Sequence, residues 1–304
     1  MFLSSVPPQQ GVLHTYGFNL TAFEFTQNYQ SSENILLFVG GLGNGLLNVP
    51  YLPALSKSTS DFKGKWNLVQ VLLSSAYSGW GTSSLDKDVN QLQKCIKYFR
   101  SERGGSRNKI VLMGHSTGCQ DSIHYLTKIL TKPDIDDVYK IDAAILQAPV
   151  SDSEAFSNEN DVDDLIKQVQ EEYIEKGKED ELLPNKFRKL MFNTPVTAYR
   201  FISLVGKRGD DDYFSSYLTQ DDYKQTFGVI TGPILILYGE SDQFVPGYVD
   251  KAKLINKWEE ATPKKYWSKY SSIISGATHD LSDTPENSIP DLIRAVINFI
   301  NNLD

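Results

Sequence analysis

Short apolar runs alternate with stretches of helical periodicity along most of the chain. Runs that are apolar at nearly every position are typical of strands buried on both faces of a parallel sheet. Two earlier segments, Val12–Phe18 and Thr21–Thr26, predict an antiparallel hairpin that leads into this sheet. The runs that we expect to form its core strands are Ile35–Val39, Leu68–Leu73, Ile110–Met113, Ala143–Leu146, Ile234–Tyr238 and Ser272–Ile274.

Helical patterns fill several of the gaps between these runs. Leu85–Arg100 carries its apolar residues on one face with a period of roughly 3.6 residues, and Gly104-Gly105 beyond it suits the end of a helix. Gly118–Leu130 follows a predicted strand directly, and Pro290–Leu303 is a third stretch with an apolar face. This alternation predicts an α/β fold, in which helices cover both faces of a mostly parallel sheet.

One stretch, between Pro149 and Gly232, interrupts the alternation. It contains helical patterns and loops but no convincing core strand, so we expect a helical cap insertion at 150–231 between core segments 1–149 and 232–304. Within it, Glu159–Glu181 holds ten acidic residues and three lysines, a charge of −7 out of the chain's −8. An apolar stripe through this segment predicts one amphipathic helix with a solvated acidic face.

Composition and charge narrow the class of protein. The chain has 304 residues, of which 40% are hydrophobic and 22% charged, so it can bury a large core. Its net charge of −8 argues against a nucleic-acid partner. No apolar run reaches the ~18 residues of a membrane span and no secretory signal is evident, so we expect a cytoplasmic protein. There, Cys95 and Cys119 should be free thiols. The sequence fixes no oligomeric state.

The segment Gly114-His115-Ser116-Thr117-Gly118 matches the pattern G-x-S-x-G. Such a match arises by chance in roughly one in ten chains of this length, so the elements on either side of it are the stronger evidence. It directly follows a predicted strand and directly precedes a helical pattern, as a nucleophile elbow requires. Ser116 is therefore the candidate nucleophile. The amide of Thr117, at the start of the helix, is a candidate donor to an oxyanion.

A base and an acid should follow the nucleophile in the order acid, then base. His279 lies on a loop after the last predicted strand and is the candidate base, because His124 is only eight residues beyond Ser116. Asp242 lies on the loop after Ile234–Tyr238 and is the candidate acid, which would hold the tautomer of His279. Glu240 is its competitor.

A glycine-rich loop, Gly40-Gly41-Leu42-Gly43-Asn44-Gly45, follows the first core strand. Its glycines let backbone amides approach a ligand, so Gly41 or Leu42 should supply the second oxyanion donor. The loop fits neither a phosphate-loop nor a dinucleotide-binding pattern, and we expect no cofactor. Trp80, after the next strand, is a candidate wall of the substrate pocket, with core packing as the alternative.

Taken together, these residues resemble the α/β-hydrolase superfamily along most of the chain. A narrower resemblance is to an uncharacterised fungal and protozoan serine hydrolase family that includes the fungal siderophore (fusarinine) esterases. The stretches that carry it are Gly114–Asp121, Ser78–Thr82, Gln147–Asp152, Gly209–Ser216 and Gly276–Leu281. The resemblance implies an esterase with Ser116, Asp242 and His279 as its triad, a helical cap and a small-molecule ester as substrate.

Several alternatives remain beside an esterase that works through an acyl-enzyme. A thioesterase, peptidase or acyltransferase uses the same residues, and a non-catalytic scaffold for binding or regulation uses none. A metal site at Asp210-Asp211-Asp212 is disfavoured, because adjacent acids point in different directions. Arg200 and Asp211 lie in a stretch rich in aromatic residues, and we expect them to line or support the substrate pocket.

Overall fold

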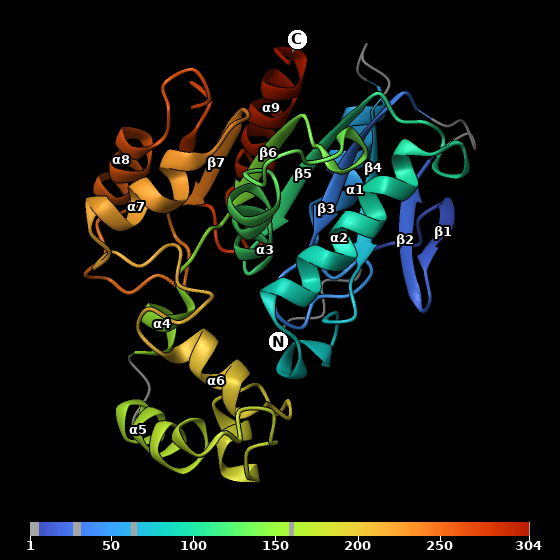
Figure 1. Cartoon of the computed structure of the whole chain (residues 1–304). Coiled ribbons are helices and arrows are strands. Elements are labelled where there is room, and N and C mark those ends of the chain that lie inside the picture. The colour runs from blue at the N-terminus through green and yellow to red at the C-terminus, as the bar shows by residue number, and fades with distance from the viewer. Residues whose placement is uncertain (1–5, 27–31, 62–65, 158–160, 304) are drawn as a thin grey trace.

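A mostly parallel sheet forms the centre of the molecule (Figure 1). The computed structural model describes residues 6–26, 32–61, 66–157 and 161–303. Within them the sheet has eight strands in the order β1-β2-β4-β3-β5-β6-β7-β8. These strands are β1 (Gly11–Gly17), β2 (Leu20–Phe25), β3 (Asn34–Val39), β4 (Trp66–Leu72), β5 (Lys109–His115), β6 (Ala143–Gln147), β7 (Ile234–Gly239) and β8 (Ser272–Ile274).

The pairing of these strands confirms the predicted α/β sheet. From β4 through β3, β5, β6 and β7 to β8, each strand pairs in parallel with the next. The hairpin β1–β2 is antiparallel and joins the sheet antiparallel to β4. Strand β6 is buried at every position and β3 at all but its first, because helices cover both faces. The carboxyl ends of these six parallel strands therefore gather at one edge of the sheet.

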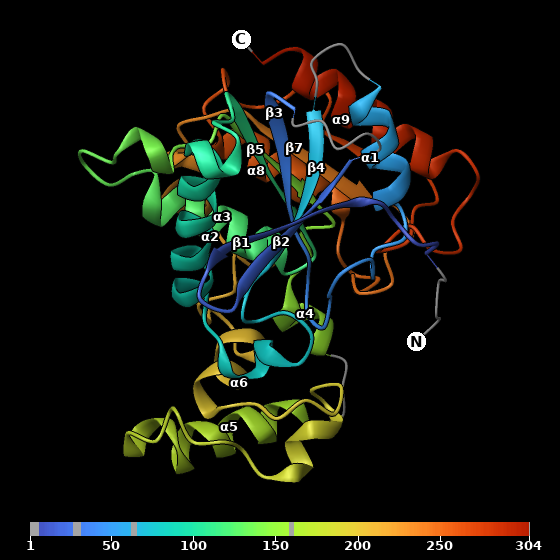
Figure 2. The same cartoon turned by 90° about the vertical axis from the view of Figure 1, so that its right-hand side faces the viewer.

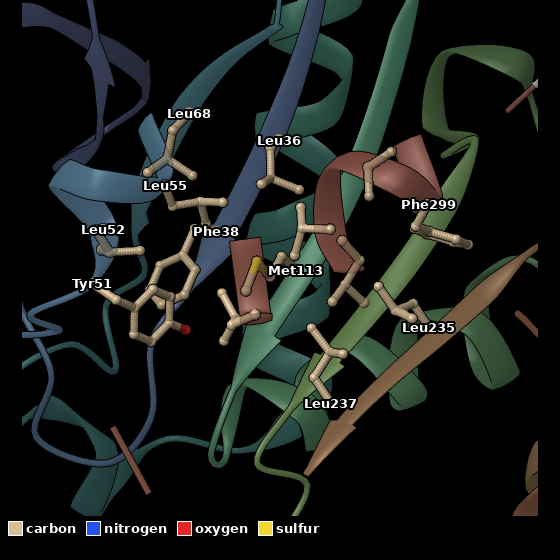
Figure 3. Close-up of a cluster of buried hydrophobic side chains, with 14 of the residues drawn as sticks. Leu36, Phe38, Tyr51, Leu52, Leu55, Leu68, Met113, Leu235, Leu237 and Phe299 are labelled. Carbon is tan, nitrogen blue, oxygen red and sulfur yellow. The ribbon is translucent and has the colours of Figure 1, made fainter. Parts of the chain in front are cut away.

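Helices pack on both faces of the sheet (Figure 2). On one face, α1 (Leu52–Ser60) and α9 (Ser288–Asn301) share a cluster with Leu36 and Phe38 of β3 (Figure 3). Ile35 and Leu37 of the same strand point to the opposite face, against α2 (Leu85–Arg100). That face also carries α3 (Gly118–His124), which continues as a π-helical turn at Tyr125–Ile129, and α8 (Lys251–Ala261). The three predicted helices are confirmed, and α1 and α8 are additional.

The segment that interrupts the strand pattern contains α4 (Asp152–Phe156), α5 (Val162–Glu172), α6 (Ala198–Val205) and α7 (Gln220–Thr226). Among its described residues no strand joins the sheet, as predicted. Helices α5 and α6 lie in the lobe at the bottom of Figure 1, where their apolar residues form a separate cluster with Trp80 and Leu42. Tyr223 and Phe227 instead pack with β6, β7 and α8.

The acidic helix is shorter than the predicted range Glu159–Glu181. Helix α5 ends at Glu172, a 3-10 turn follows at Ile174–Lys176, and Gly177 takes a φ of 67°. Beyond Gly177 the backbone is hydrogen bonded to another helix. The carbonyls of Glu179 and Glu181 accept hydrogen bonds from the amides of Tyr199 and Ala198, at the start of α6. The unpaired amides of α6 thus compete with helix extension for these carbonyls. Residues 159 and 160 lie outside the described residues.

Candidate active site

The turn between β5 and α3 has the geometry that G-x-S-x-G predicts. Ser116 has a φ of 55°, in the left-handed region that a side chain disfavours. Its amide donates to the Gln147 carbonyl at 3.1 Å, and its carbonyl accepts from the Cys119 amide at 2.8 Å. A Cβ added to Gly118 would lie 2.3 Å from the Val39 carbonyl oxygen, so this position requires glycine. Ser116 is partly exposed, while its two neighbours in the chain are buried.

His279 and Asp242 meet at the same edge of the sheet. Asp242 lies on the loop after β7 and His279 on the loop after β8. The Nδ1 atom of His279 is 2.8 Å from Oδ2 of Asp242, and the two side chains are almost fully buried. The other carboxylate oxygen accepts the amide of Phe244 at 3.0 Å. This arrangement keeps a proton on Nδ1, which donates to the carboxylate, and leaves Nε2 of His279 as the basic nitrogen.

Glu240, the competing acid, is engaged elsewhere. Its Oε2 accepts the Gly276 amide at 2.7 Å and the Ser275 hydroxyl at 2.9 Å. These hydrogen bonds hold the pKa of Glu240 below its usual value, and the side chain is exposed. The structure therefore brings Asp242, and not Glu240, to His279.

Two other histidines lie close to the elbow but have different partners. His115 is part of the elbow itself and is buried, with Nδ1 2.5 Å from Gln147 Oε1. Burial, and then the nearby His279, lowers the pKa of His115 to about 4, so the ring is neutral at pH 7. His124 contacts the Tyr213 hydroxyl at 2.6 Å and Asp86 at 2.8 Å. Neither of them is paired with a buried carboxylate that could support a base.

The nucleophile and the base are not bonded to each other in this structure. Among the described residues, Ser116 Oγ has no hydrogen bond to Nε2 of His279. The ring centroid of His279 lies 5.0 Å from that of His115, the residue before the serine. Two members of the predicted triad are thus hydrogen bonded, and the third stands on the adjacent turn. Its contact with His279 stays a prediction.

The glycine-rich loop after β3 lies against the serine. A Cβ added to Gly41 would be 2.5 Å from Ser116 Cβ and 3.0 Å from its Oγ. The Gly41 amide already donates to Asn44 Oδ1 at 2.8 Å. Across the described part of the chain, the amides of Leu42 and Thr117 have no hydrogen-bond acceptor. Of the two candidates in this loop, Leu42 therefore has the amide that is free to bind an oxyanion.

The three predicted pocket residues, Trp80, Arg200 and Asp211, are buried, and Arg200 is hydrogen bonded to the other two. Arg200 donates through Nη1 to Asp211 Oδ2 at 2.5 Å and through Nε to the Trp80 carbonyl at 3.1 Å. This joint ties α6 to the loop after β4. These contacts are internal to the protein, so a role of the three residues in the substrate pocket stays a prediction.

The neighbouring acids show no arrangement for a metal. The carboxylate of Asp210 accepts the Tyr199 hydroxyl at 2.7 Å, whereas that of Asp212 accepts the Arg208 amide at 2.8 Å. In the described ranges, no group of three or more His, Cys, Asp or Glu side chains is placed to hold a metal ion. Likewise, none of the described helices is long and apolar enough to cross a membrane. Cys95 and Cys119 are buried and unpaired, as expected.

Sequence reasoning missed the role of Gln147, which is hydrogen bonded to both Ser116 and His279. Its carbonyl holds the Ser116 amide, and its side chain reaches the His279 carbonyl at 3.1 Å. The available signal was a polar residue at the carboxyl end of an otherwise apolar buried strand, Ala143–Gln147. Phe244 was also missed: its ring contacts that of His279 edge to face, at a centroid distance of 4.7 Å.

Comparisons with known proteins place this chain in a family. A Schizosaccharomyces pombe protein named UPF0613 is 40% identical, covering 95% of this chain and 94% of its own. Fusarinine C esterase sidJ of Aspergillus fumigatus is 35% identical, covering 96% of each chain. The solved structure of siderophore hydrolase EstB from Aspergillus fumigatus superposes with a TM-score of 0.81 at 31% identity, covering 99% of each chain.

The solved structures that resemble this chain are α/β hydrolases, which confirms the predicted fold class. The resemblance to the family of the fungal siderophore esterases is confirmed as well. The family described as "Protein of unknown function (DUF1749)" matches residues 1–301. This match spans nearly the whole chain, and the chain therefore belongs to that family.

Proposed function

We propose that this chain hydrolyses a carboxylic ester through an acyl-enzyme on Ser116, with His279 as base and Asp242 as the acid that orients it. The reaction class rests on its relatives: the chain is a carboxylic ester hydrolase, as its named homologues are esterases. The assignment of residues rests on one observation. A buried His279–Asp242 hydrogen bond of 2.8 Å lies beside a strained serine at a strand–helix turn.

The proposed reaction has two halves. Ser116 Oγ attacks the ester carbonyl carbon while Nε2 of His279 takes the hydroxyl proton, and Asp242 stabilises the imidazolium. Collapse of the tetrahedral intermediate breaks the bond to the alcohol oxygen, which leaves with the proton from Nε2. A water then attacks the acyl-enzyme, gives its proton to Nε2, and releases the acid as Ser116 recovers its proton.

The negative charge of each intermediate develops on the former carbonyl oxygen. We assign its stabilisation to the amides of Leu42 and Thr117, which lack other acceptors among the described residues. Gly41 then has a spatial role: its missing Cβ leaves room for the Ser116 side chain. Two fixed amide donors aimed at a developing oxyanion are worth several kcal/mol of the barrier, roughly 3 kcal/mol each by analogy with other hydrolases.

For the substrate, we propose a siderophore-like small-molecule ester. Support comes from two relatives named for such substrates, fusarinine C esterase and siderophore hydrolase, each aligned over nearly the full chain. The division into a core, 1–149 and 232–304, and a cap, 150–231, is part of this proposal. It is supported by the separate cluster of α5 and α6, which packs on Leu42 beside the serine. Trp80, Arg200 and Asp211 would then support the pocket, and the protein would act in the cytoplasm.

The test is labelling with a fluorophosphonate probe, followed by peptide mapping. The proposal expects one label, on Ser116, and none in Ser116→Ala. Turnover is then compared among a short activated ester, the matching thioester and fusarinine C, the compound for which one relative is named. Labelling at another residue would overturn the assignment. Faster hydrolysis of the thioester than of either ester would favour the thioesterase alternative.

A further inference from the structure

Gln147 stands between the two halves of the candidate site. It is the last residue of β6, paired in register with His115 of β5 on one side and with Leu237 of β7 on the other. Strand β5 leads into the serine turn, and β7 leads into the loop of Asp242. The side chain is 1% exposed, so all its polar atoms must be satisfied within the protein.

Its side-chain amide makes three hydrogen bonds to three distant segments. Nε2 donates to the His279 carbonyl at 3.1 Å. Oε1 accepts the Tyr51 hydroxyl at 2.9 Å and lies 2.5 Å from Nδ1 of His115. Tyr51 is part of the apolar cluster in Figure 3, beside Phe38, and is fully buried. The amide therefore joins the elbow, the base loop and the segment before α1 at one point.

The orientation of this amide is fixed by its partners. The carbonyl oxygen of His279 can only accept, so it requires the N–H of the amide. Oε1 then faces the Tyr51 hydroxyl and Nδ1 of His115, and both donate to it. A flipped amide would set Oε1 against the carbonyl oxygen of His279. Only the observed orientation satisfies every group.

We propose that Gln147 is a positioning residue, which holds the loop of His279 at the height where Nε2 can reach Ser116. The inference rests on the proposed roles of Ser116 and His279. The backbone carbonyl of Gln147 fixes the serine amide, and its side chain fixes the histidine carbonyl, so one residue sets the spacing of both. Misplacement by about 1 Å costs on the order of 10²-fold in rate, which sets the scale of the expected effect.

Three variants separate the contacts of Gln147. Gln147→Met keeps the length but removes every side-chain hydrogen bond. Gln147→Glu keeps the acceptor for Tyr51 and His115 and, once its carboxyl is ionised, has no donor for the His279 carbonyl. Its kcat is therefore measured across pH, because a protonated carboxyl would donate in place of the N–H. Tyr51→Phe removes a donor to Oε1 and leaves the N–H in place. Gln91→Met is the matched control, because Gln91 is also buried and bonded, but to Ser74.

We expect kcat per folded molecule to fall about 10- to 100-fold in Gln147→Met and Gln147→Glu, with KM changed less than about threefold. Tyr51→Phe and Gln91→Met should stay within about threefold of wild type in both constants. The rate of fluorophosphonate labelling at Ser116 should fall in parallel with kcat. Folded fraction is measured by circular dichroism, and Gln147→Glu carries the test if Gln147→Met does not fold.

The outcomes distinguish this inference from the proposed function. Retained turnover in Ser116→Ala would defeat the triad itself. With Ser116 labelled in wild type, undiminished kcat in both Gln147 variants would overturn only the role of Gln147. A rise in KM alone would also overturn it. So would a loss of kcat in Gln147→Met that Gln147→Glu does not share at any pH, because an ionised carboxylate has no donor for the His279 carbonyl.

Discussion

At the scale of the residue, Ser116 combines strain with exposure. Its φ of 55° places a side chain in a region that costs about 1–2 kcal/mol, and close contacts on both sides hold it there. A glycine at this position would relieve the strain, whereas an alanine would keep it. Substitution by alanine and by glycine therefore separates the effect of the strained backbone on stability from the effect of the hydroxyl on turnover.

Ser116→Ala and Ser116→Gly should both lose turnover by a factor on the order of 10⁴ to 10⁶, because the nucleophile is absent. Ser116→Gly should be the more stable of the two, by about 1 kcal/mol, since it removes the strain. Steady-state hydrolysis and urea unfolding measure the two effects. More than a tenth of wild-type hydrolysis in either variant would contradict the role of Ser116.

Asp242→Asn should cost roughly 10⁴ in kcat, because the amide cannot hold the Nδ1 proton of His279 in the reactive tautomer. Glu240→Gln is the control: that side chain is exposed and bonds Ser275 and Gly276, so its loss should change kcat little. Both are measured with one activated ester at saturating concentration. A larger effect from Glu240→Gln would reverse our choice of acid.

At the scale of the element, strands were predicted better than helices. The central parallel strands are buried on both faces, so an unbroken run of apolar residues is enough to predict them. The predicted strand Ile234–Tyr238, for example, is one residue shorter than β7. Helix α1 escaped notice because its nine residues include four serine and threonine residues with only a weak apolar face. Helix α5 was predicted too long, because the α6 amides that bond the carbonyls of Glu179 and Glu181, beyond its end, are distant in sequence.

The residues of the candidate site could be proposed from the sequence where a motif marks them, and not where tertiary contacts bring them together. Ser116 and His279 follow from chain order and from the strand ends. The network of Gln147 joins residues 51, 115, 147 and 279, and no periodicity relates these positions. The choice of Leu42 over Gly41 depended on a single turn, in which Asn44 takes the Gly41 amide.

The joint between α6 and the loop after β4 yields a prediction at this scale. Arg200→Ala would leave the buried Asp211 carboxylate without its guanidinium, which typically costs about 3–5 kcal/mol of stability. If the joint also supports the pocket, the ratio of kcat/KM between a bulky polar ester and a short one should change. Asp211→Ala should change it in the same direction. An unchanged ratio in both variants would remove the joint from the substrate site.

At the scale of the whole molecule, buried acids gather where the core meets the inserted segment. Burial, and then the charge of Asp211, raises the pKa of Asp152 to about 8. Burial also raises the pKa of Asp88 on α2 and of Asp121 on α3, while Arg200 opposes both shifts. Each of these groups keeps its proton in the folded protein at a pH where the unfolded chain releases it.

Stability should therefore fall as pH rises. Between about pH 4, where an unfolded aspartate ionises, and about pH 8, the native state binds more protons than the unfolded state, so the free energy of unfolding decreases. Asp152→Asn mimics the protonated form, and its amide oxygen can still accept from Gln120. Urea unfolding from pH 5 to 8.5 should show a shallower decline in this variant, with Asp88 and Asp121 supplying the remainder. An equally steep decline would contradict the assignment to Asp152.

The exposed acids of α5 and the turn after it have a consequence for the rate of encounter. These acids lie on the lobe whose apolar cluster packs against Leu42, next to Ser116. The electrostatic field of their negative charge reaches about 10 Å into solution at 0.1 M salt. A cationic ester should be drawn toward this lobe and an anionic one repelled. Raising the ionic strength should then lower kcat/KM for the first, raise it for the second and leave a neutral ester of the same size unaffected. Equal responses of all three would mean that substrates approach Ser116 beyond the reach of this field.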